Sequence, residues 1–405
     1  MDLQREAPKD TSSTTVSLLP QSPSSTSVAY RNLPQELWDM TALYLKEDLK
    51  SLKACSLTSE ALRQASRKLF WRSLSLRSSA GLESLLSKHP DVAVFVQKLS
   101  VYLPLAKIQL LLKFKNLKSF RWSNESEGED VLDDTTPFLQ CVAFPGVTDL
   151  FLSWYDDLQD VSRLGLLACF PGINTLRIEG PSFIFGKKVD DDCKEVLQAI
   201  SLSLPHLQYL YFSYARLTPT FSQIMHATGN SLKFVKVDIQ EKFDETTAEL
   251  LGISHATHLT GLEVHLGFLP TSPNWGDTLA MTLQQVKSSH KSLTRILLHV
   301  PSLLPDNRTG LQRTWAAPGE RLGQQLSRVM KDVPSVTVTF YQAGSLSTWA
   351  ANHAHGTLGY NLQNDFPDLT AFRKRLRFKW NVKVWSKEDG PSHVHNEALI
   401  QAWQL

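Results

Sequence analysis

Residues 144–153 read FPGVTDLFLS, and this short stretch decides the fold. Val147, Leu150 and Leu152 form an apolar-x-x-apolar-x-apolar unit, whose last two apolar positions alternate as they do in a strand with one buried face. Phe144-Pro145 comes just before this unit. Proline ends a helix because it lacks a backbone N–H and restricts the residue before it. The stretch therefore predicts a helical segment that ends and a short strand that starts at once.

The same unit returns along most of the chain, at irregular intervals of roughly 20 to 40 residues. Segments with helical periodicity, such as GLESLLSKHP (81–90) and TLAMTLQQVKSS (278–289), lie between the units. Strands joined repeatedly by crossover helices predict an irregular solenoid with a parallel sheet on its concave face. An ordinary doubly wound sheet is the alternative, and the recurrence of one template favours the solenoid. The other units are Val96/Leu99/Val101, Leu117/Phe120/Trp122, Ile173/Leu176/Ile178, Leu207/Leu210/Phe212, Leu232/Val235/Val237, Leu259/Leu262/Val264, Leu293/Ile296/Leu298 and Val333/Val336/Val338.

Residues 376–384 alternate apolar side chains with Arg377, Lys379, Asn381 and Lys383. This pattern predicts a strand with one buried face and one basic face. A nucleic-acid surface would need its stacking aromatics on the exposed face. We therefore interpret the segment as a closing strand of the array.

The first part of the chain has a different pattern. Residues 1–29 are rich in Ser, Thr and Pro and are predicted to be disordered. Order begins at LPQELWDM (33–40), where Pro34 suits a helix start; Leu37, Met40 and Tyr44 follow at helical spacing, with Trp38 and Leu45 on an adjoining stripe. Asp48, and then Thr58 or Ser59, are suitable N-caps for two further short helices. The expected organisation of this α/β protein is a tail (1–29), a small helical module (30–78) and the solenoid with a C-terminal cap (79–405).

Composition restricts the class of protein. The chain has 405 residues, 42% of them hydrophobic and 20% charged, with a formal net charge of +2, as in a soluble globular protein. Such a charge gives no reason to expect nucleic acid or an anionic membrane as a partner, and no apolar run approaches the about 20 residues of a membrane span. The four cysteines include no Cys-x-x-Cys pair, and the N-terminus does not resemble a secretory signal. An intracellular protein, cytoplasmic or nuclear, is expected.

Motifs of catalysis are absent from the sequence. It contains no Walker A loop, no Gly-x-Gly-x-x-Gly, no Gly-x-Ser-x-Gly and no His-Glu-x-x-His. The His353/His355 and His393/His395 pairs could bind a metal, but they have no third ligand nearby in the sequence, so polar loop histidines are the better interpretation. The sequence predicts a protein that is not an enzyme and has no catalytic residue, cofactor or metal.

Residues 33–76, LPQELWDMTALYLKEDLKSLKACSLTSEALRQASRKLFWRSLSL, resemble the F-box of fungal, particularly mushroom-type, F-box proteins. The following LESLLSKHPDVAVFVQKLSV and FPGVTDLFLS are similar to the degenerate leucine-rich repeats that accompany the F-box there. The resemblance implies a substrate adaptor that docks on Skp1, and through it on a cullin–RING ubiquitin ligase, while the repeats recruit an unknown target protein. The Skp1-binding positions that it implies are Leu33, Pro34, Leu37, Leu45, Leu49, Leu52, Cys55 and Leu57.

Two alternatives stay open at this point. Each of these leucines could instead fill the core of the helical module. The first helix also carries Thr41-Ala42 where the family usually has an aliphatic pair, which would weaken Skp1 binding. A repeat scaffold that joins no ligase is therefore the second hypothesis. Along the concave face, Arg121, Ser153, Arg177 and Tyr211 are examples of residues that would contact the target.

Overall fold

The computed structural model describes residues 34–103, 105–123, 143–153, 166–179, 204–213, 219–239, 245–266, 275–300, 320–346, 367–372, 374–384 and 398–400. The chain divides into two compact units, residues 1–66 and 67–405. The predicted tail, residues 1–29, lies outside the described residues. The division comes earlier than the boundary expected at residue 78. Residues 67–78 belong with the sheet because Lys98 and Gln97 donate backbone hydrogen bonds to the Arg72 carbonyl and Arg67 pairs with Asp91.

The smaller unit contains the expected short helices, α1 (Gln35–Tyr44), α2 (Leu49–Cys55) and the first part of α3 (Glu60–Phe70). Asp48 caps α2 by accepting hydrogen bonds from the backbone N–H groups of Lys50 and Ser51. The Ser59 hydroxyl accepts from the N–H of Leu62 and caps α3. These side chains satisfy N–H groups that the start of a helix leaves unpaired. This unit has a small core: among its described residues, the buried side chains are those of Ala42, Leu52, Ala65 and Ser66, and three of these four are small.

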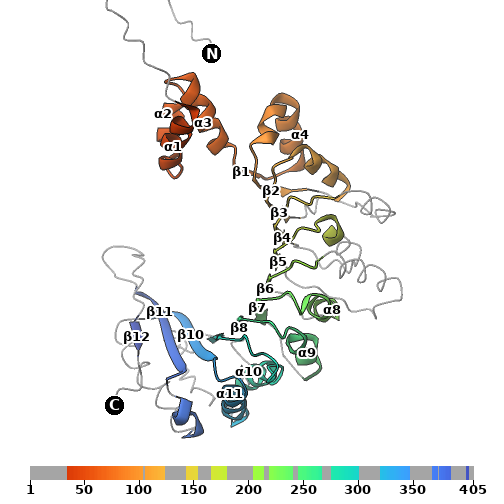
Figure 1. Ribbon diagram of the computed structural model, residues 1–405, viewed down its shortest axis with the longest axis vertical. Helices are drawn as coiled ribbons and strands as arrows, with labels where there is room; N and C mark the ends of the chain where they lie inside the picture. The colour runs from red at the N-terminus through yellow and green to blue at the C-terminus, as the bar shows by residue number, and fades with distance from the viewer. Residues whose placement is uncertain are drawn as a thin grey trace, which may run out of the picture. The chain divides into compact units, whose positions relative to one another are not determined.

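In its described residues, the larger unit is an α/β structure with one 12-stranded sheet, whose strands follow one another in sequence order (Figure 1). Neighbouring strands from β1 to β11 are parallel, and β12 is antiparallel to β11. The parallel sheet predicted from the sequence is confirmed. The strands are β1 (Ser73–Leu76), β2 (Lys98–Tyr102), β3 (Ser119–Ser123), β4 (Asp149–Ser153), β5 (Thr175–Glu179), β6 (Tyr209–Ser213), β7 (Phe234–Ile239), β8 (Gly261–Leu266), β9 (Arg295–Val300), β10 (Thr337–Leu346), β11 (Leu376–Val384) and β12 (Ala398–Ile400).

The apolar template explains the register of this sheet. The middle positions of the template pair across neighbouring strands, as in Phe120 with Leu150 and Leu150 with Leu176. Every apolar residue of the template, from Val96 to Val338, is buried. A shift by one residue would turn these side chains to the opposite face, so burial fixes the pairing.

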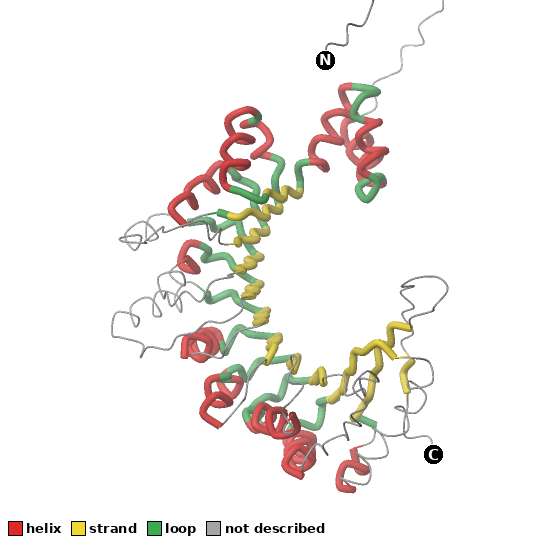
Figure 2. Tube along the Cα trace, turned by 180° about the vertical axis from the view of Figure 1, so that it is seen from behind, coloured by secondary structure: helices red, strands yellow, loops and turns green. Residues whose placement is uncertain are grey.

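The connections between strands lie on one face of the sheet and leave the other face without helices among the described residues (Figure 2). The predicted helical segments 81–90 and 278–289 correspond to α4 and α10, while the closing strand expected at 376–384 is β11. The connections are α4 (Ser79–Lys88), η1 (Pro90–Val94), η2 (Leu105–Lys113), η3 (Leu166–Cys169), α8 (Pro219–Thr228), α9 (Glu245–Leu250), η4 (Ile253–His255), α10 (Trp275–Gln284), α11 (Glu320–Asp332) and η5 (Pro367–Phe372).

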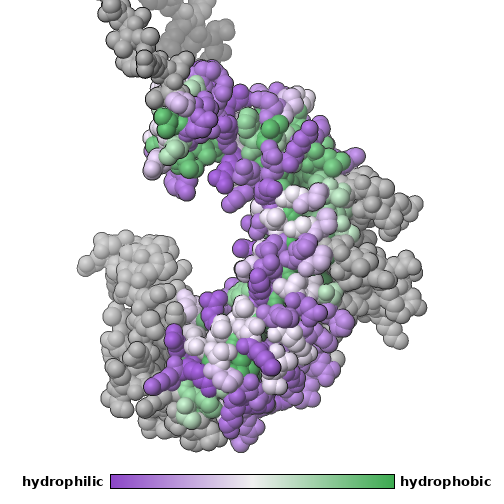
Figure 3. All heavy atoms as spheres, in the orientation of Figure 1, coloured by the Kyte–Doolittle hydropathy of each residue, from purple (hydrophilic) through white to green (hydrophobic). Residues whose placement is uncertain are grey.

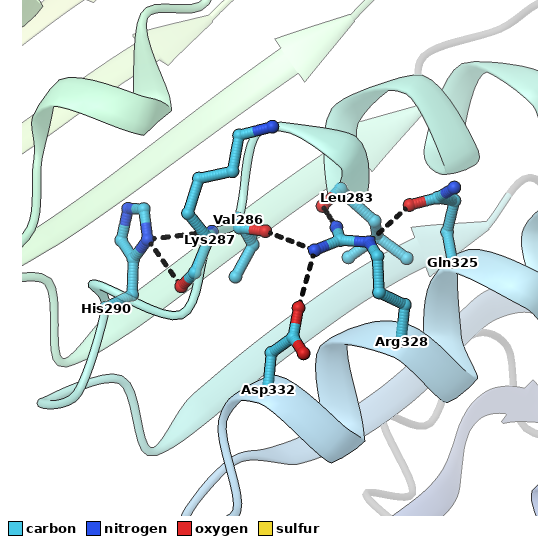
Figure 4. Close-up of polar contacts among 7 residues, drawn as sticks. All are labelled: Leu283, Val286, Lys287, His290, Gln325, Arg328 and Asp332. Atoms are coloured by element: carbon cyan, nitrogen blue, oxygen red, sulfur yellow. Dashed lines mark hydrogen bonds and ion pairs between the residues drawn. The ribbon is translucent and has the colours of Figure 1, made fainter.

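Polar contacts join successive connections. Arg328 of α11 donates hydrogen bonds to the carbonyl oxygens of Leu283 and Val286 at the end of α10 (Figure 4). His290 is fully buried, and its Nδ1 accepts from the N–H of Lys287 at 3.0 Å. Its Nε2 is then the donor to the Ile253 carbonyl, also at 3.0 Å. These contacts fasten α11 to the end of α10, and the turn after α10 to η4.

Candidate functional site

The first candidate surface is formed by exposed apolar side chains on α1. One side of this helix faces the core of the unit. Ala42 on this side is fully buried, and Trp38 and the C-terminal cap residue Leu45 are half-buried. The opposite side carries Leu37, Met40, Leu43 and Tyr44, which are 45%, 54%, 48% and 86% exposed. We call these four residues the α1 surface. Figure 3 shows apolar residues at the surface of the smaller unit.

The positions proposed for Skp1 binding separate into groups. Leu33 lies outside the described residues. Pro34, Leu37, Leu49 and Leu57 are exposed, while Leu45 and Cys55 are half-buried. Leu52 is fully buried, so it packs inside the unit and its side chain is not available to a partner in this structure. Leu52 is therefore a core residue, because it faces inward from the middle of α2.

The Thr41-Ala42 pair also divides between surface and core. Thr41 is exposed, and its hydroxyl donates a 2.8 Å hydrogen bond to the Leu37 carbonyl one turn earlier. Ala42 has no exposed surface. A larger side chain at residue 42 would therefore enter the core of this unit instead of extending the α1 surface.

The second candidate surface is the face of the sheet that the helices leave open. Side chains alternate between the two faces of a strand, so every second residue points to this open face. Residues at matching positions of neighbouring strands therefore form rows across it. Arg121, Phe151, Arg177, Tyr211, Lys236 and Glu263 occupy successive strands from β3 to β8 in this row.

Cations and aromatic rings alternate in the first part of this row. The Arg121 guanidinium lies 4.1 Å from the centroid of the Phe151 ring, and that of Arg177 lies 4.6 Å from the centroid of the Tyr211 ring. Both arginines are exposed, and Tyr211 is half-buried. Ser153, which we expected on this surface, is instead buried. Stacking holds the two guanidinium groups in place while both side chains stay exposed, and Arg121 Nη2 also lies 3.9 Å from Glu179 Oε2 on β5.

A polar cluster continues the same face across β7, β8 and β9. Glu263 Oε1 lies 2.6 Å from His265 Nε2, 3.3 Å from His299 Nε2 and 3.0 Å from Lys236 Nζ. The imidazole rings of His265 and His299 stack with their centroids 3.5 Å apart. Asp238 Oδ1 lies 3.6 Å from His265 Nδ1. We call Glu263, His265 and His299 the His–Glu cluster.

The surroundings fix the charges within this cluster. Burial alone would raise the pKa of Glu263, but the contacts of its carboxylate with His265, His299 and Lys236 outweigh burial and hold the pKa far below its usual range. Burial lowers the pKa of His299, although its contact with Glu263 opposes this shift. At neutral pH Glu263 is therefore ionised and His299 is uncharged.

Sequence reasoning missed the His–Glu cluster. His265 and His299 hold the same position relative to the template, since each comes one residue after its last apolar position, Val264 or Leu298. In a parallel sheet equal template positions become neighbours, as His265 and His299 are. The template alone could have predicted their contact. The pairs that we did consider, His353/His355 and His393/His395, lie outside the described residues.

No protein family and no curated protein matches this chain. Among the described helices, none has both the length and the apolar character needed to cross a membrane.

Proposed function

We propose that the protein is a non-enzymatic F-box substrate adaptor of a cullin–RING ubiquitin ligase, and that its larger unit is an irregular leucine-rich-repeat-like solenoid. The smaller unit docks on a Skp1-like protein, which joins the adaptor to the cullin. The open face of the sheet recruits a target protein. The adaptor accelerates ubiquitin transfer by holding the target near an enzyme that other subunits supply.

The α1 surface carries this proposal. A large apolar residue on a protein surface costs little by itself, but a group of them on one short helix is characteristic of an interaction site. Leu37, Met40 and Tyr44 share one side of α1 and are all exposed. Covering such side chains contributes about 25 cal/mol per Å² of apolar area, and a few central residues dominate the affinity of an interface. Leu49 and Leu57, at 60% and 76% exposure, add apolar area in the same unit.

The stacked arginines support the second half of the proposal. Arg121 and Arg177 present hydrogen-bond donors from a rigid sheet, and Phe151 and Tyr211 hold them in place. Arginine and aromatic residues are enriched where proteins bind other proteins. Their order before binding lowers the entropy lost on association.

Co-purification tests the docking step. The full chain, expressed with a Skp1-like protein, is expected to retain it, and the Leu37→Asp, Tyr44→Asp double variant is expected to lose it. Both side chains point away from the core of the unit, so the variant should keep the circular dichroism spectrum of the wild type.

Leu112→Asp is the matched control, because Leu112 is 53% exposed but lies in the larger unit. It is expected to bind the Skp1-like protein as the wild type does. Failure of the wild-type chain to retain this protein would refute the adaptor function and favour a scaffold that joins no ligase. Equal retention by the wild type and the double variant would refute the role of the α1 surface.

A further inference from the structure

The His–Glu cluster has the composition and spacing of a metal site. One ligand atom from each of Glu263, His265 and His299 lies within 4.8 Å of the others. Around a tetrahedral zinc ion with bonds of about 2.0 to 2.1 Å, neighbouring ligand atoms lie roughly 3.3 Å apart. His299 Nε2 and Glu263 Oε1 already have a 3.3 Å separation. His265 Nε2, at 2.6 Å from the same oxygen, requires only a small shift.

We propose that Glu263, His265 and His299 bind a divalent transition metal of the zinc class on the open face of the sheet. Two imidazoles and one carboxylate are a ligand set that zinc takes in proteins, with a further position left for another ligand. That position faces away from the helices, where water or a donor side chain of a bound protein completes the coordination.

Two buried atoms of the cluster that lack a well-formed hydrogen bond also point to a missing ligand. Within the described part of the chain, the buried atoms His299 Nε2 and Asp238 Oδ1 make no well-formed hydrogen bond, and they lie 3.3 Å from Glu263 Oε1 and 3.6 Å from His265 Nδ1 respectively. A buried polar atom without a partner costs free energy. A metal ion would use the lone pair of His299 Nε2 directly.

Asp238 supplies the outer contact that such sites commonly have. Its Oδ1 lies 3.6 Å from His265 Nδ1, on the other side of the ring from Glu263. A carboxylate in this position orients the imidazole and makes the coordinating nitrogen a better donor. Tyr341, whose ring centroid is 4.6 Å from that of His299, limits the movement of the second imidazole.

Lys236 competes with the metal for Glu263. Its ammonium group lies 3.0 Å from Glu263 Oε1 and neutralises part of the negative charge. A network of side-chain ion pairs without metal is therefore the competing explanation. The two explanations differ in the effect of Lys236→Met, which removes a partner from an ion-pair network but removes a competitor from a metal site.

Calorimetric titration of the tag-free, chelator-treated full chain with Zn²⁺ tests the proposal, and Co²⁺ absorption reports the coordination geometry. We expect a site that His299→Ala and Glu263→Gln each abolish and that Asp238→Asn weakens about tenfold or more. Lys236→Met should tighten binding about fivefold, which is the scale of a partly exposed ion pair. His258→Ala removes an exposed histidine from the loop before β8 and should leave the affinity unchanged.

Several results would overturn the metal site. The first is the absence of zinc binding by the wild type. The second is equal zinc binding by the wild type and by Glu263→Gln. Because glutamine has nearly the same shape as glutamate, Glu263→Gln should stay folded even if His299→Ala does not. Binding that persists in both variants would place the metal elsewhere in the chain. The result does not depend on the adaptor function, because no Skp1-like protein takes part in the titration.

Discussion

The Nη2 of Arg328 donates a 2.8 Å hydrogen bond to the carbonyl oxygen of Leu283, 45 residues earlier in the chain. Arg375 repeats this contact, since its Nη2 donates to the Met330 carbonyl at 2.7 Å with the same separation of 45 residues. The Nη1 atoms of both arginines reach a second carbonyl 42 residues earlier, in Val286 and Val333. Each arginine thus donates to one carbonyl in the last turn of the preceding helix and to one just beyond it, although Leu283 and Val333 also accept from the backbone N–H groups of Val286 and Val336.

Arg328→Lys should lower the free energy of unfolding by about 1 to 2 kcal/mol, because an ammonium group cannot reproduce the forked contact with two carbonyls. Denaturant titration measures the change. Arg321→Lys on the same helix is the control, since Arg321 contacts the exposed Glu245 and should change stability by less than about 0.5 kcal/mol. Equal effects of the two substitutions would contradict the capping role.

Gly172→Ala should be destabilising by about 1 to 3 kcal/mol, the usual cost of overpacking. A Cβ atom at residue 172 would lie 2.4 Å from the Pro145 carbonyl oxygen, in the matching turn before the preceding strand. Gly81→Ala is the opposite case: among the described residues, its Cβ would meet the Ser78 hydroxyl alone, at 3.4 Å. Because alanine favours the helix, Gly81→Ala should raise stability by about 0.5 kcal/mol. Thermal unfolding of the two variants should shift in opposite directions.

Leu52→Ala should destabilise the smaller unit by about 2 to 5 kcal/mol, since Leu52 is a fully buried core side chain. Leu57→Ala should change its stability by less than about 0.5 kcal/mol, because that side chain is 76% exposed. Hydrogen exchange of α1, α2 and α3, followed by mass spectrometry, measures the stability of this unit separately from that of the sheet. Strong protection in Leu52→Ala would show that Leu52 is not a core residue.

Ala42→Leu should lower the stability of the smaller unit by about 1 to 3 kcal/mol, because Ala42 has no exposed surface and the larger side chain overpacks the core. Thr41→Leu should keep the unit folded and, under the proposed function, strengthen binding of the Skp1-like protein. The same hydrogen-exchange measurement and the co-purification assay check both variants. A stabilising Ala42→Leu would mean that the site has room for a larger residue.

Cys169 should resist alkylation by iodoacetamide in the native protein at about pH 8, because only the thiolate reacts. Burial raises the pKa of the Cys169 thiol to about 11. The side chain is also fully inaccessible, whereas that of Cys55 is half-buried. Mass spectrometry should find Cys55 modified first and Cys169 modified only after denaturation. Equal labelling of both residues in the native protein would contradict this environment.

The strands were predictable from the sequence because their pattern is local. Within each template unit, such as Leu207/Leu210/Phe212, burial on one face requires apolar residues at fixed positions, and the structure buries all of them. Proline-containing turns such as Phe144-Pro145 also indicated where strands start, because the effect of proline on the backbone is local as well. The first strand, β1, was not predicted, since the short SLSL of residues 73–76 carries too little of the template.

The candidate sites were less predictable because they depend on contacts between strands and on the inward direction of each helix. Helical spacing placed Leu37, Met40 and Tyr44 together, but it did not reveal that this side is exposed while Ala42 is buried. Leu52 resembled its exposed neighbours Leu49 and Leu57 in sequence and differs from them only in direction. Pairing of β8 with β9 was needed to bring His299 to Glu263.

The order of the sheet has a consequence for how the chain is made. Each strand from β1 to β12 pairs with strands that are its neighbours in sequence. None of these described strands therefore has to wait for a distant part of the chain, which keeps the sequence separation of its contacts low. The sheet can grow strand by strand as the ribosome releases the polypeptide, and a shortened chain would keep every pairing made before the point of truncation.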